Sequence, residues 1–156
     1  MRCMESAEKT IELADEQATE ALGAAIAACL APGAAVTLTG DLGAGKTTLA
    51  RGAVRALLGQ VEVPSPTFTL VQTYETPGFE LWHADLYRIE HEDELDELGL
   101  EDAFEDAACL VEWPERLGPR LPERRLDVRL SFAEGGGRRA ALTAHGEFWV
   151  GRLEQI

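Results

Sequence analysis

Apolar residues recur along this 156-residue chain at two spacings, one typical of helices and one typical of strands. The helical spacing predicts helices over 16–30 and 46–58, followed by short amphipathic helices within 90–106. Short apolar or alternating runs predict strands over 35–39, 67–74, 79–85, 108–112, 125–132 and 138–144, with a short final element over 148–153. Asp15 is placed to cap the first helix, and Gly59 to end the second. This alternation of helices with strands is typical of an α/β protein.

Two of the predicted strand pairs are joined by turn-forming residues. Thr76-Pro77-Gly78 links 67–74 to 79–85, and Glu134-Gly135-Gly136-Gly137 links 125–132 to 138–144, so each pair is predicted to form a hairpin. The chain has a length typical of one domain, and we expect a single domain over residues 1–156. Residues 1–14, which lack an apolar run, are expected to form a partly ordered N-terminal segment.

A glycine-rich motif lies between the strand predicted at 35–39 and the helix predicted at 46–58. The motif, of the form GxxxxGK[ST], consists of Gly40, Asp41, Leu42, Gly43, Ala44, Gly45, Lys46 and Thr47. Glycines allow backbone N–H groups to curl around phosphates, and the N-terminus of the following helix adds partial positive charge. Lys46 is then expected to reach the β- and γ-phosphates, and the Thr47 hydroxyl to bind Mg²⁺. The motif therefore predicts a nucleotide-binding P-loop.

Two carboxylates are candidates for the acid that such a loop needs beside its Mg²⁺. Asp85 and Glu112 each follow an apolar strand, which is the position that a metal-binding acid takes in P-loop proteins. Thr67 follows a Ser-Pro pair and could sense the γ-phosphate, although the same pattern is common in ordinary loops. His83 lies near a strand end, where a structural role is more common than proton relay.

The nucleotide is predicted to be ATP. Guanine-specific GTPases use an NKxD motif, and this chain contains no Asn. It also lacks the LSGGQ signature of ABC ATPases. Two other functions stay open. The chain could be a small-molecule kinase, whose lid would use Arg116, Arg120, Arg124 and Arg125, or a nucleotide-binding regulator with negligible turnover.

Charge and cysteine content narrow the set of partners and locations. Lys plus Arg is 14 and Asp plus Glu is 28, which gives a net charge of −14, and ten of the acids lie in 90–106. Binding of nucleic acid or an anionic membrane by this chain alone is therefore not expected. Cys3, Cys29 and Cys109 are widely spaced and are expected to be free, mostly buried thiols. We find no signal peptide and no run of about 18 apolar residues, so a cytoplasmic location is expected.

Five sequence blocks, taken together and in order, resemble the TsaE (YjeE) family of small bacterial P-loop ATPases. They are GDLGAGKTTLARG at 40–52, SPTFTLVQTYE at 65–75, HADLYRI at 83–89, ELGLEDAF at 97–104 and LVEWPERL at 110–117. The resemblance implies a mixed sheet in which parallel central strands are flanked by antiparallel strands, with helices on both faces. The two predicted hairpins agree with that arrangement.

The resemblance also implies roles for individual residues. Residues 40–48, which include Thr48, would hold the ATP phosphates, and Arg138, in a Gly-Arg pair, would approach the nucleotide. Thr67 matches the switch threonine of the family, Asp85 the acid of its HxDxYR motif, and Glu112 the acid at the metal. The family assists the TsaB–TsaD heterodimer in the threonylcarbamoyl modification of adenosine 37 in tRNA. This chain would then bind and hydrolyse ATP with Mg²⁺, while its partners hold the tRNA.

Overall fold

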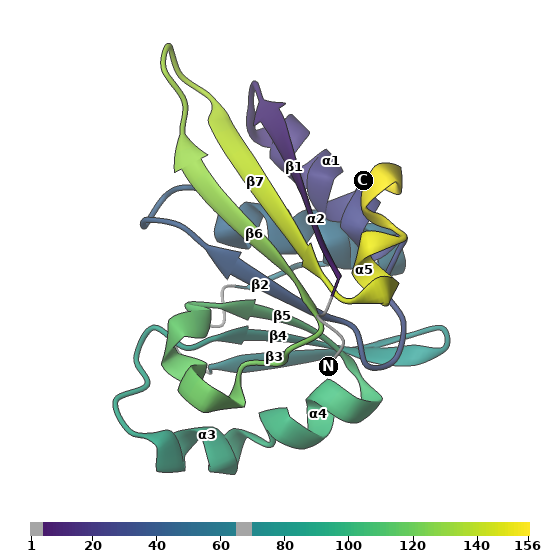
Figure 1. The fold of residues 1–156 in the computed structure, drawn as a ribbon, viewed down its shortest axis with the longest axis vertical. Coiled ribbons are helices and arrows are strands. Elements are labelled where there is room, and N and C mark those ends of the chain that lie inside the picture. Colours follow the sequence, from purple (N-terminus) through teal and green to yellow (C-terminus); the bar gives the residue numbers. More distant parts are fainter. Residues whose placement is uncertain (1–4, 65–69) are drawn as a thin grey trace.

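A computed structural model describes residues 5–64 and 70–156, in which seven strands form one mixed sheet (Figure 1). The strands are β1 (Ser6–Leu13), β2 (Ala35–Thr39), β3 (Val71–Thr76), β4 (Phe79–Asp85), β5 (Ala108–Glu112), β6 (Arg125–Phe132) and β7 (Arg138–His145). Their order across the sheet is β1-β7-β6-β2-β5-β4-β3. Neighbours from β6 to β4 run parallel, whereas β1–β7, β7–β6 and β4–β3 are antiparallel pairs. The predicted mixed sheet and both predicted hairpins are confirmed.

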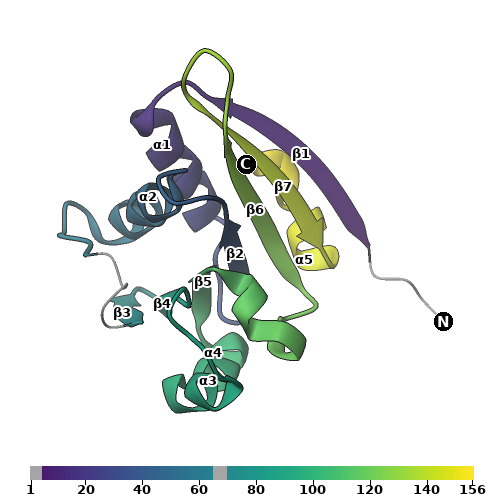
Figure 2. The ribbon, with the colours of Figure 1, turned by 90° about the vertical axis from the view of Figure 1, so that its left-hand side faces the viewer.

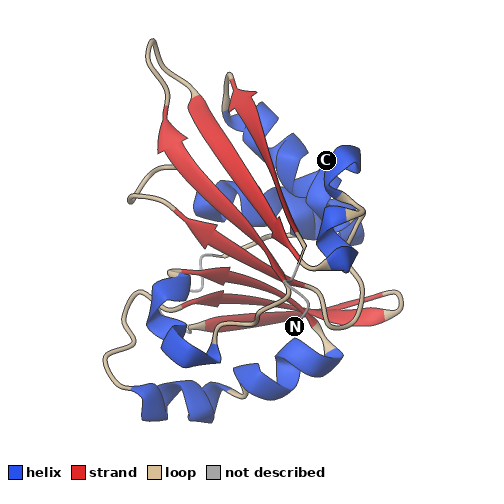
Figure 3. Cartoon of the chain, in the orientation of Figure 1, coloured by secondary structure: helices blue, strands red, loops and turns tan. Residues whose placement is uncertain are grey.

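Helices pack on both faces of the sheet, as predicted (Figures 2 and 3). They are α1 (Glu16–Ala27), α2 (Lys46–Leu58), α3 (Glu92–Leu98), α4 (Leu100–Asp106) and α5 (Glu147–Val150), together with two 3₁₀ helices, η1 (Pro114–Arg120) and η2 (Leu153–Gln155). One apolar cluster packs α1, α2 and α5 against the sheet, and a second packs α3, α4 and η1 against β4 and β5. Strands β2 and β5 are therefore covered on both sides, which explains their nearly unbroken apolar sequences.

The sequence pattern does not predict strand β1. Ser6–Leu13 pairs along its whole length with β7, and its residues alternate between exposed and partly buried positions. Its inward-facing positions include Lys9, and carboxylates occupy Glu8 and Glu12 on the other face, so the apolar alternation is weak. Charged residues are typical of an edge strand, where they discourage pairing with a further chain. Part of the N-terminal segment therefore completes one edge of the sheet.

Several predicted boundaries differ from the structure, and one short helix was not predicted. Helix α1 ends at Ala27 rather than at residue 30, because the N–H groups of Cys29 and Leu30 bond to carbonyls three residues earlier and tighten the last turn. Strand β3 spans Val71–Thr76, where 67–74 was predicted; residues 65–69, and Thr67 among them, lie outside the described residues. The helix η1 was not predicted; it begins at Pro114, immediately after the left-handed Trp113 (φ 59°).

Helices α1 and α2 are in close contact because two glycines face the neighbouring backbone. A Cβ atom at Gly52 would lie 2.2 Å from the Glu20 carbonyl oxygen, and one at Gly23 would lie 2.0 Å from the Leu49 carbonyl oxygen. Neither position has room for a side chain. The contact fixes α1 beside the start of α2, where the P-loop lies.

The described cysteines are free and buried, as expected, and Cys3 lies outside the described residues. Burial raises the pKa of the Cys109 thiol to about 12, so this thiol stays protonated and packs as a small apolar group. Within 5–64 and 70–156, none of the helices combines the length and the apolar character needed to cross a bilayer.

Candidate functional site

The P-loop connects the carboxyl end of β2 to the N-terminus of α2. Gly40, Gly43 and Gly45 have φ angles of 155°, 82° and 111°, in the region that favours glycine. Gly40 is also confined, because a Cβ atom there would lie 2.6 Å from the Leu130 carbonyl oxygen of β6. No side chain within the described residues caps the N-terminus of α2. Its first N–H groups are thus directed into the loop, an arrangement suited to an anion.

Lys46, the first residue of α2, is 6% exposed and folds back over the loop. Its ammonium group donates to the carbonyl oxygens of Gly40 and, at 3.4 Å, of Asp41. The same group lies 4.3 Å from the centroid of the Trp113 ring, which holds it by a cation–π contact. Trp113 packs in turn on Tyr87, with ring centroids 4.9 Å apart. Lys46 is therefore placed at the loop, with carbonyl groups and an aromatic face as its neighbours.

The two predicted acids lie side by side at the carboxyl ends of neighbouring strands. Asp85 ends β4 and Glu112 ends β5, and the two residues are register partners. The Oγ1 atom of Thr47 lies 3.4 Å from each carboxylate oxygen of Glu112. His83 Nε2 lies 2.6 Å from Glu112 Oε2, and both side chains are buried. The Asp85 carboxylate accepts a hydrogen bond from the Tyr87 N–H at 3.0 Å. Glu112, rather than Asp85, is the acid that contacts the P-loop threonine in the described residues.

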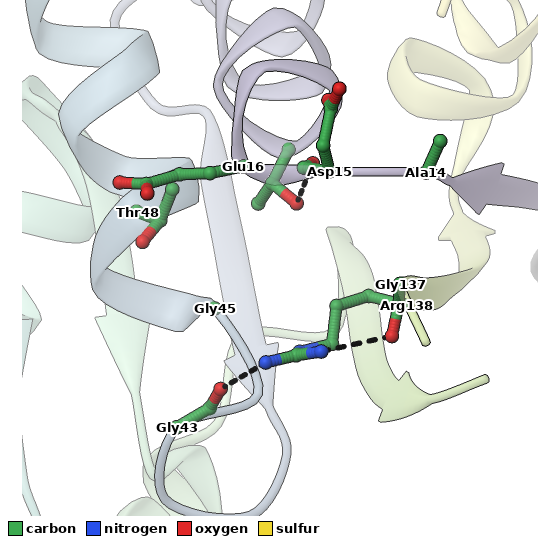
Figure 4. A pocket seen from close by; sticks show the side chains of 9 residues that line it. Ala14, Asp15, Glu16, Gly43, Gly45, Thr48, Gly137 and Arg138 are labelled. Carbon is green, nitrogen blue, oxygen red and sulfur yellow. Dashed lines mark hydrogen bonds between the residues drawn. The ribbon is translucent and has the colours of Figure 1, made fainter. Parts of the chain in front are cut away.

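A cavity of about 250 Å³ opens beside the P-loop (Figure 4). Its walls come from the start of α1, from the P-loop and α2, and from the start of β7; they are lined by Ala14, Asp15, Glu16, Thr19, Gly43, Gly45, Thr48, Gly137 and Arg138. Arg138 crosses the opening and donates to the carbonyl oxygens of Gly43 at 3.1 Å and Gly137 at 2.9 Å. Its guanidinium group also lies 4.3 Å from the Phe132 ring centroid. Arg138 and Thr48 thus both lie beside the P-loop.

Other predicted residues are distributed around this centre. Leu42 is 69% exposed at the tip of the loop, whereas Ala44 is buried beneath it. Thr67 lies outside the described residues. Of the arginines that a kinase lid would use, Arg120 forms ion pairs with carboxylates of α3 and α4, and Arg125 with Asp127. Two of the four candidate lid arginines are therefore held by carboxylates of the protein itself.

The oxygen atoms around Thr47 suit a Mg²⁺ ion that also binds phosphate and water, rather than a metal ion that is bound by protein side chains alone. Within the described parts of the chain, three or more His, Cys, Asp or Glu side chains nowhere gather in a metal-binding arrangement. Mg²⁺ in nucleotide sites commonly takes one or two carboxylates together with substrate phosphates and water. The hydroxyl of Thr47 and the carboxylate of Glu112 are oxygen donors of that kind.

Two parts of the site are absent from the sequence prediction. Asp15 and Thr19 line the cavity from α1, but no motif marks them, because their place depends on how α1 packs on α2. The contact of His83 with Glu112 was also missed. The spacing could have indicated it, because His83 is two residues before Asp85 and alternate residues of a strand share one face.

This chain is similar in sequence to known proteins over most of its length. Residues 13–140 match the family described as Threonylcarbamoyl adenosine biosynthesis protein TsaE. The tRNA threonylcarbamoyladenosine biosynthesis protein TsaE of Rickettsia bellii is 39% identical over 132 residues, covering 84% of this chain and 92% of that protein. The protein of the same name from Bacillus subtilis is 40% identical over 139 residues, covering 88% and 87%.

The fold has a solved counterpart as well. The crystal structure of Bacillus subtilis YdiB superposes with a TM-score of 0.79 at 29% identity, covering 99% of this chain and 96% of that one. The sequence matches and the superposition span nearly the whole chain, including the P-loop and the strands that carry Asp85 and Glu112. This chain therefore belongs to the TsaE family of threonylcarbamoyl adenosine biosynthesis proteins.

Proposed function

We propose that this chain binds and hydrolyses ATP with Mg²⁺ and thereby assists the threonylcarbamoyl modification of adenosine 37 in tRNA, acting with the TsaB–TsaD heterodimer. One observation carries the proposal: the buried Glu112 carboxylate lies 3.4 Å from the Thr47 hydroxyl, beside a P-loop lysine at the uncapped N-terminus of α2. The names of the relatives from Rickettsia bellii and Bacillus subtilis support the pathway.

The P-loop and the adjoining cavity suit a nucleoside triphosphate. The backbone N–H groups of the loop and the Lys46 ammonium would hold the phosphates. The cavity beside Gly43, Gly45 and Thr48 continues from the loop and would hold the nucleoside. Arg138 borders both regions, so its guanidinium would neutralise phosphate charge. These contacts would bind and orient the nucleotide.

Thr47 and Glu112 would hold Mg²⁺, with Asp85 on the neighbouring strand. The bound ion would supply charge neutralisation for the phosphates during transfer to water. Glu112 and Asp85 are carboxylates, and either would also orient a water molecule near the γ-phosphate. Thr67 is assigned the switch role by resemblance alone, since it lies outside the described residues.

The charge of the chain suits an accessory role. A net charge of −14 repels tRNA, so the partners rather than this chain would hold the RNA. Nucleotide binding would then favour docking on the heterodimer, and hydrolysis would reset it.

The proposal is tested with Glu112→Ala, compared with Glu115→Ala as a control three residues away at an exposed position. ATP hydrolysis and tRNA modification by the reconstituted complex are measured together. Glu112→Ala should lower both by about tenfold or more, because the metal loses a carboxylate. Glu115→Ala should leave both unchanged. If Glu112→Ala alters neither rate, the assigned role is wrong.

The same assay separates hydrolysis from the kinase alternative. The proposed function predicts that the γ-phosphate is recovered as inorganic phosphate. Recovery on a metabolite would instead identify a kinase. A rate that stays negligible when the partners are added would identify a nucleotide-binding regulator.

A further inference from the structure

His83 is a fully buried polar residue to which the proposed function assigns no role. It lies in β4 with 0% of its side chain exposed, among apolar neighbours of the cluster that packs α1 and α2 on the sheet. Its Nε2 atom lies 2.6 Å from Glu112 Oε2. Among the described residues, Nδ1 has no hydrogen-bond partner. A buried imidazole with a single hydrogen bond is costly in free energy, so the contact with Glu112 needs an explanation.

The register of the sheet places the contact between His83 and Glu112 next to the candidate metal site. Strands β4 and β5 are parallel, with His83 opposite Leu110 and Asp85 opposite Glu112. Alternate residues of a strand share a face, so His83 and Asp85 point to the same side of the sheet as Glu112. His83 lies two residues before Asp85 on β4, further from the carboxyl end of the strand. His83 therefore contacts Glu112 from within the sheet, whereas Thr47 contacts it from the start of α2.

The Glu112 carboxylate depends on this contact because it has little access to water. Only 3% of its side chain is exposed. A buried carboxylate that lacks hydrogen bonds is strongly destabilised. Within the described residues, its side-chain hydrogen bonds come from His83 at 2.6 Å and from Thr47 at 3.4 Å. The shorter bond goes to Oε2 alone, which leaves Oε1 to face Thr47 without competition from the imidazole.

We propose that His83 is a positioning residue that holds Glu112 ready for the metal. The Nε2–H group of His83 donates to Oε2 and fixes the carboxylate in one orientation, with Oε1 and the Thr47 hydroxyl directed toward the place of the ion. With the proton on Nε2, Nδ1 is a bare acceptor rather than an unpaired donor. Partners of this kind orient metal ligands in other proteins, and their loss weakens metal binding about 10- to 100-fold. The inference rests on the proposed function, since it concerns the ion that Glu112 would bind.

Two substitutions separate positioning from packing. In His83→Gln, the amide nitrogen lies at the same side-chain position as Nε2 and can still donate to Glu112. In His83→Leu, the side chain fills the space but cannot donate. His145→Asn is a matched control, because His145 pairs with a carboxylate of the same sheet, Asp127 at 2.8 Å, but lies on β7 rather than at the P-loop. The thermal unfolding temperature of each variant is measured without ligand, to show whether the substitution alters the stability of the fold.

The deciding measurement is the Mg²⁺ concentration that half-saturates ATP binding, measured by calorimetry without turnover. His83→Leu should raise this concentration about 10- to 100-fold, whereas His83→Gln should stay within about threefold of the wild type. His145→Asn should leave it unchanged. In a Glu112→Ala background, His83→Leu should have no further effect, because the carboxylate that it positions is gone.

Equal Mg²⁺ dependence in the wild type and His83→Leu would overturn the inference while leaving the proposed function intact. A wild type that binds ATP without any Mg²⁺ dependence would instead contradict the proposed function. If His83→Leu does not fold, His83→Asn serves in its place, because its shorter amide cannot reach Glu112. A loss of Mg²⁺ affinity that persists in the Glu112→Ala background would also contradict positioning, since it would act through another route.

Discussion

Lys46 and Lys9 are the only two lysines in the chain, and their surroundings differ completely. Lys46 is 6% exposed and donates to P-loop carbonyls, whereas Lys9 lies on the edge strand β1. We expect Lys46→Ala to lower ATP affinity by about 100-fold or more, because a buried charge-assisted contact with phosphate is lost. Lys9→Ala provides a control that removes the same charge.

Calorimetric titration with ATP and Mg²⁺ measures both variants of this pair. Lys9→Ala should keep the wild-type affinity, since Lys9 is not among the residues that line the cavity beside the P-loop. Equal losses in both variants would mean that net charge, rather than the position of Lys46, governs nucleotide binding. Both variants should melt near the wild-type temperature.

At the scale of single residues, the sequence points to candidate side chains but not to the contacts between them. The P-loop motif predicts Lys46 and Thr47 as site residues, and the strand ends predict Asp85 and Glu112. Which of the two acids contacts Thr47 depends on the sheet register and on the 3.4 Å approach of Thr47 to Glu112, two residues that lie 65 positions apart in the chain. Tertiary distances of that kind leave no trace in local spacing.

Among the elements, the pair α1 and α2 controls the shape of the cavity. A Cβ atom at Gly52 would lie 2.2 Å from the Glu20 carbonyl oxygen, so Gly52→Ala must push the two helices apart. We expect a loss of about 3 kcal/mol in the free energy of unfolding, measured by urea denaturation. ATP affinity should fall as well, because α1 carries Asp15 and Thr19, which line the cavity.

The exposed Ala21 of α1 offers a control for the glycine substitution. Ala21→Gly is the reverse exchange and should cost about 1 kcal/mol through helix propensity alone, with ATP affinity unchanged. A wild-type unfolding curve for Gly52→Ala would show that the helices can separate freely, contrary to the close contact described above.

Strands buried on both faces were predictable with their bounds, whereas the edge strand β1 was not. Strands β2 and β5 agree with their predicted bounds, because burial on both faces demands an apolar sequence that stands out. Strand β1 was missed because an edge strand is half exposed and carries charges, and because its partner β7 lies at the other end of the chain. Helix η1 begins at Pro114, directly after the left-handed Trp113, a backbone conformation that no propensity rule anticipates.

For the whole molecule, the net charge of −14 leads to a prediction about how affinity for tRNA depends on salt concentration. Proteins that bind RNA through phosphate contacts gain affinity as salt is lowered, because counterions are released. This chain should not gain affinity for tRNA when salt is lowered, because lower salt lengthens the range of the repulsion between the chain and tRNA. At physiological salt, we expect the dissociation constant to be larger than about 10⁻⁴ M, and we expect no binding to appear at low salt.

Filter binding of labelled tRNA to the isolated protein, over a range of salt concentrations, measures how the affinity changes with salt. The same preparation must bind ATP with Mg²⁺, which shows that it is folded and competent. Adding TsaB and TsaD should then bring tRNA and this chain into one complex, since the partners would supply the basic surface that this chain lacks in net charge. Affinity of the isolated chain for tRNA that rises as salt falls would require a local basic surface strong enough to overcome the charge of −14, and would move RNA binding from the partners to this protein.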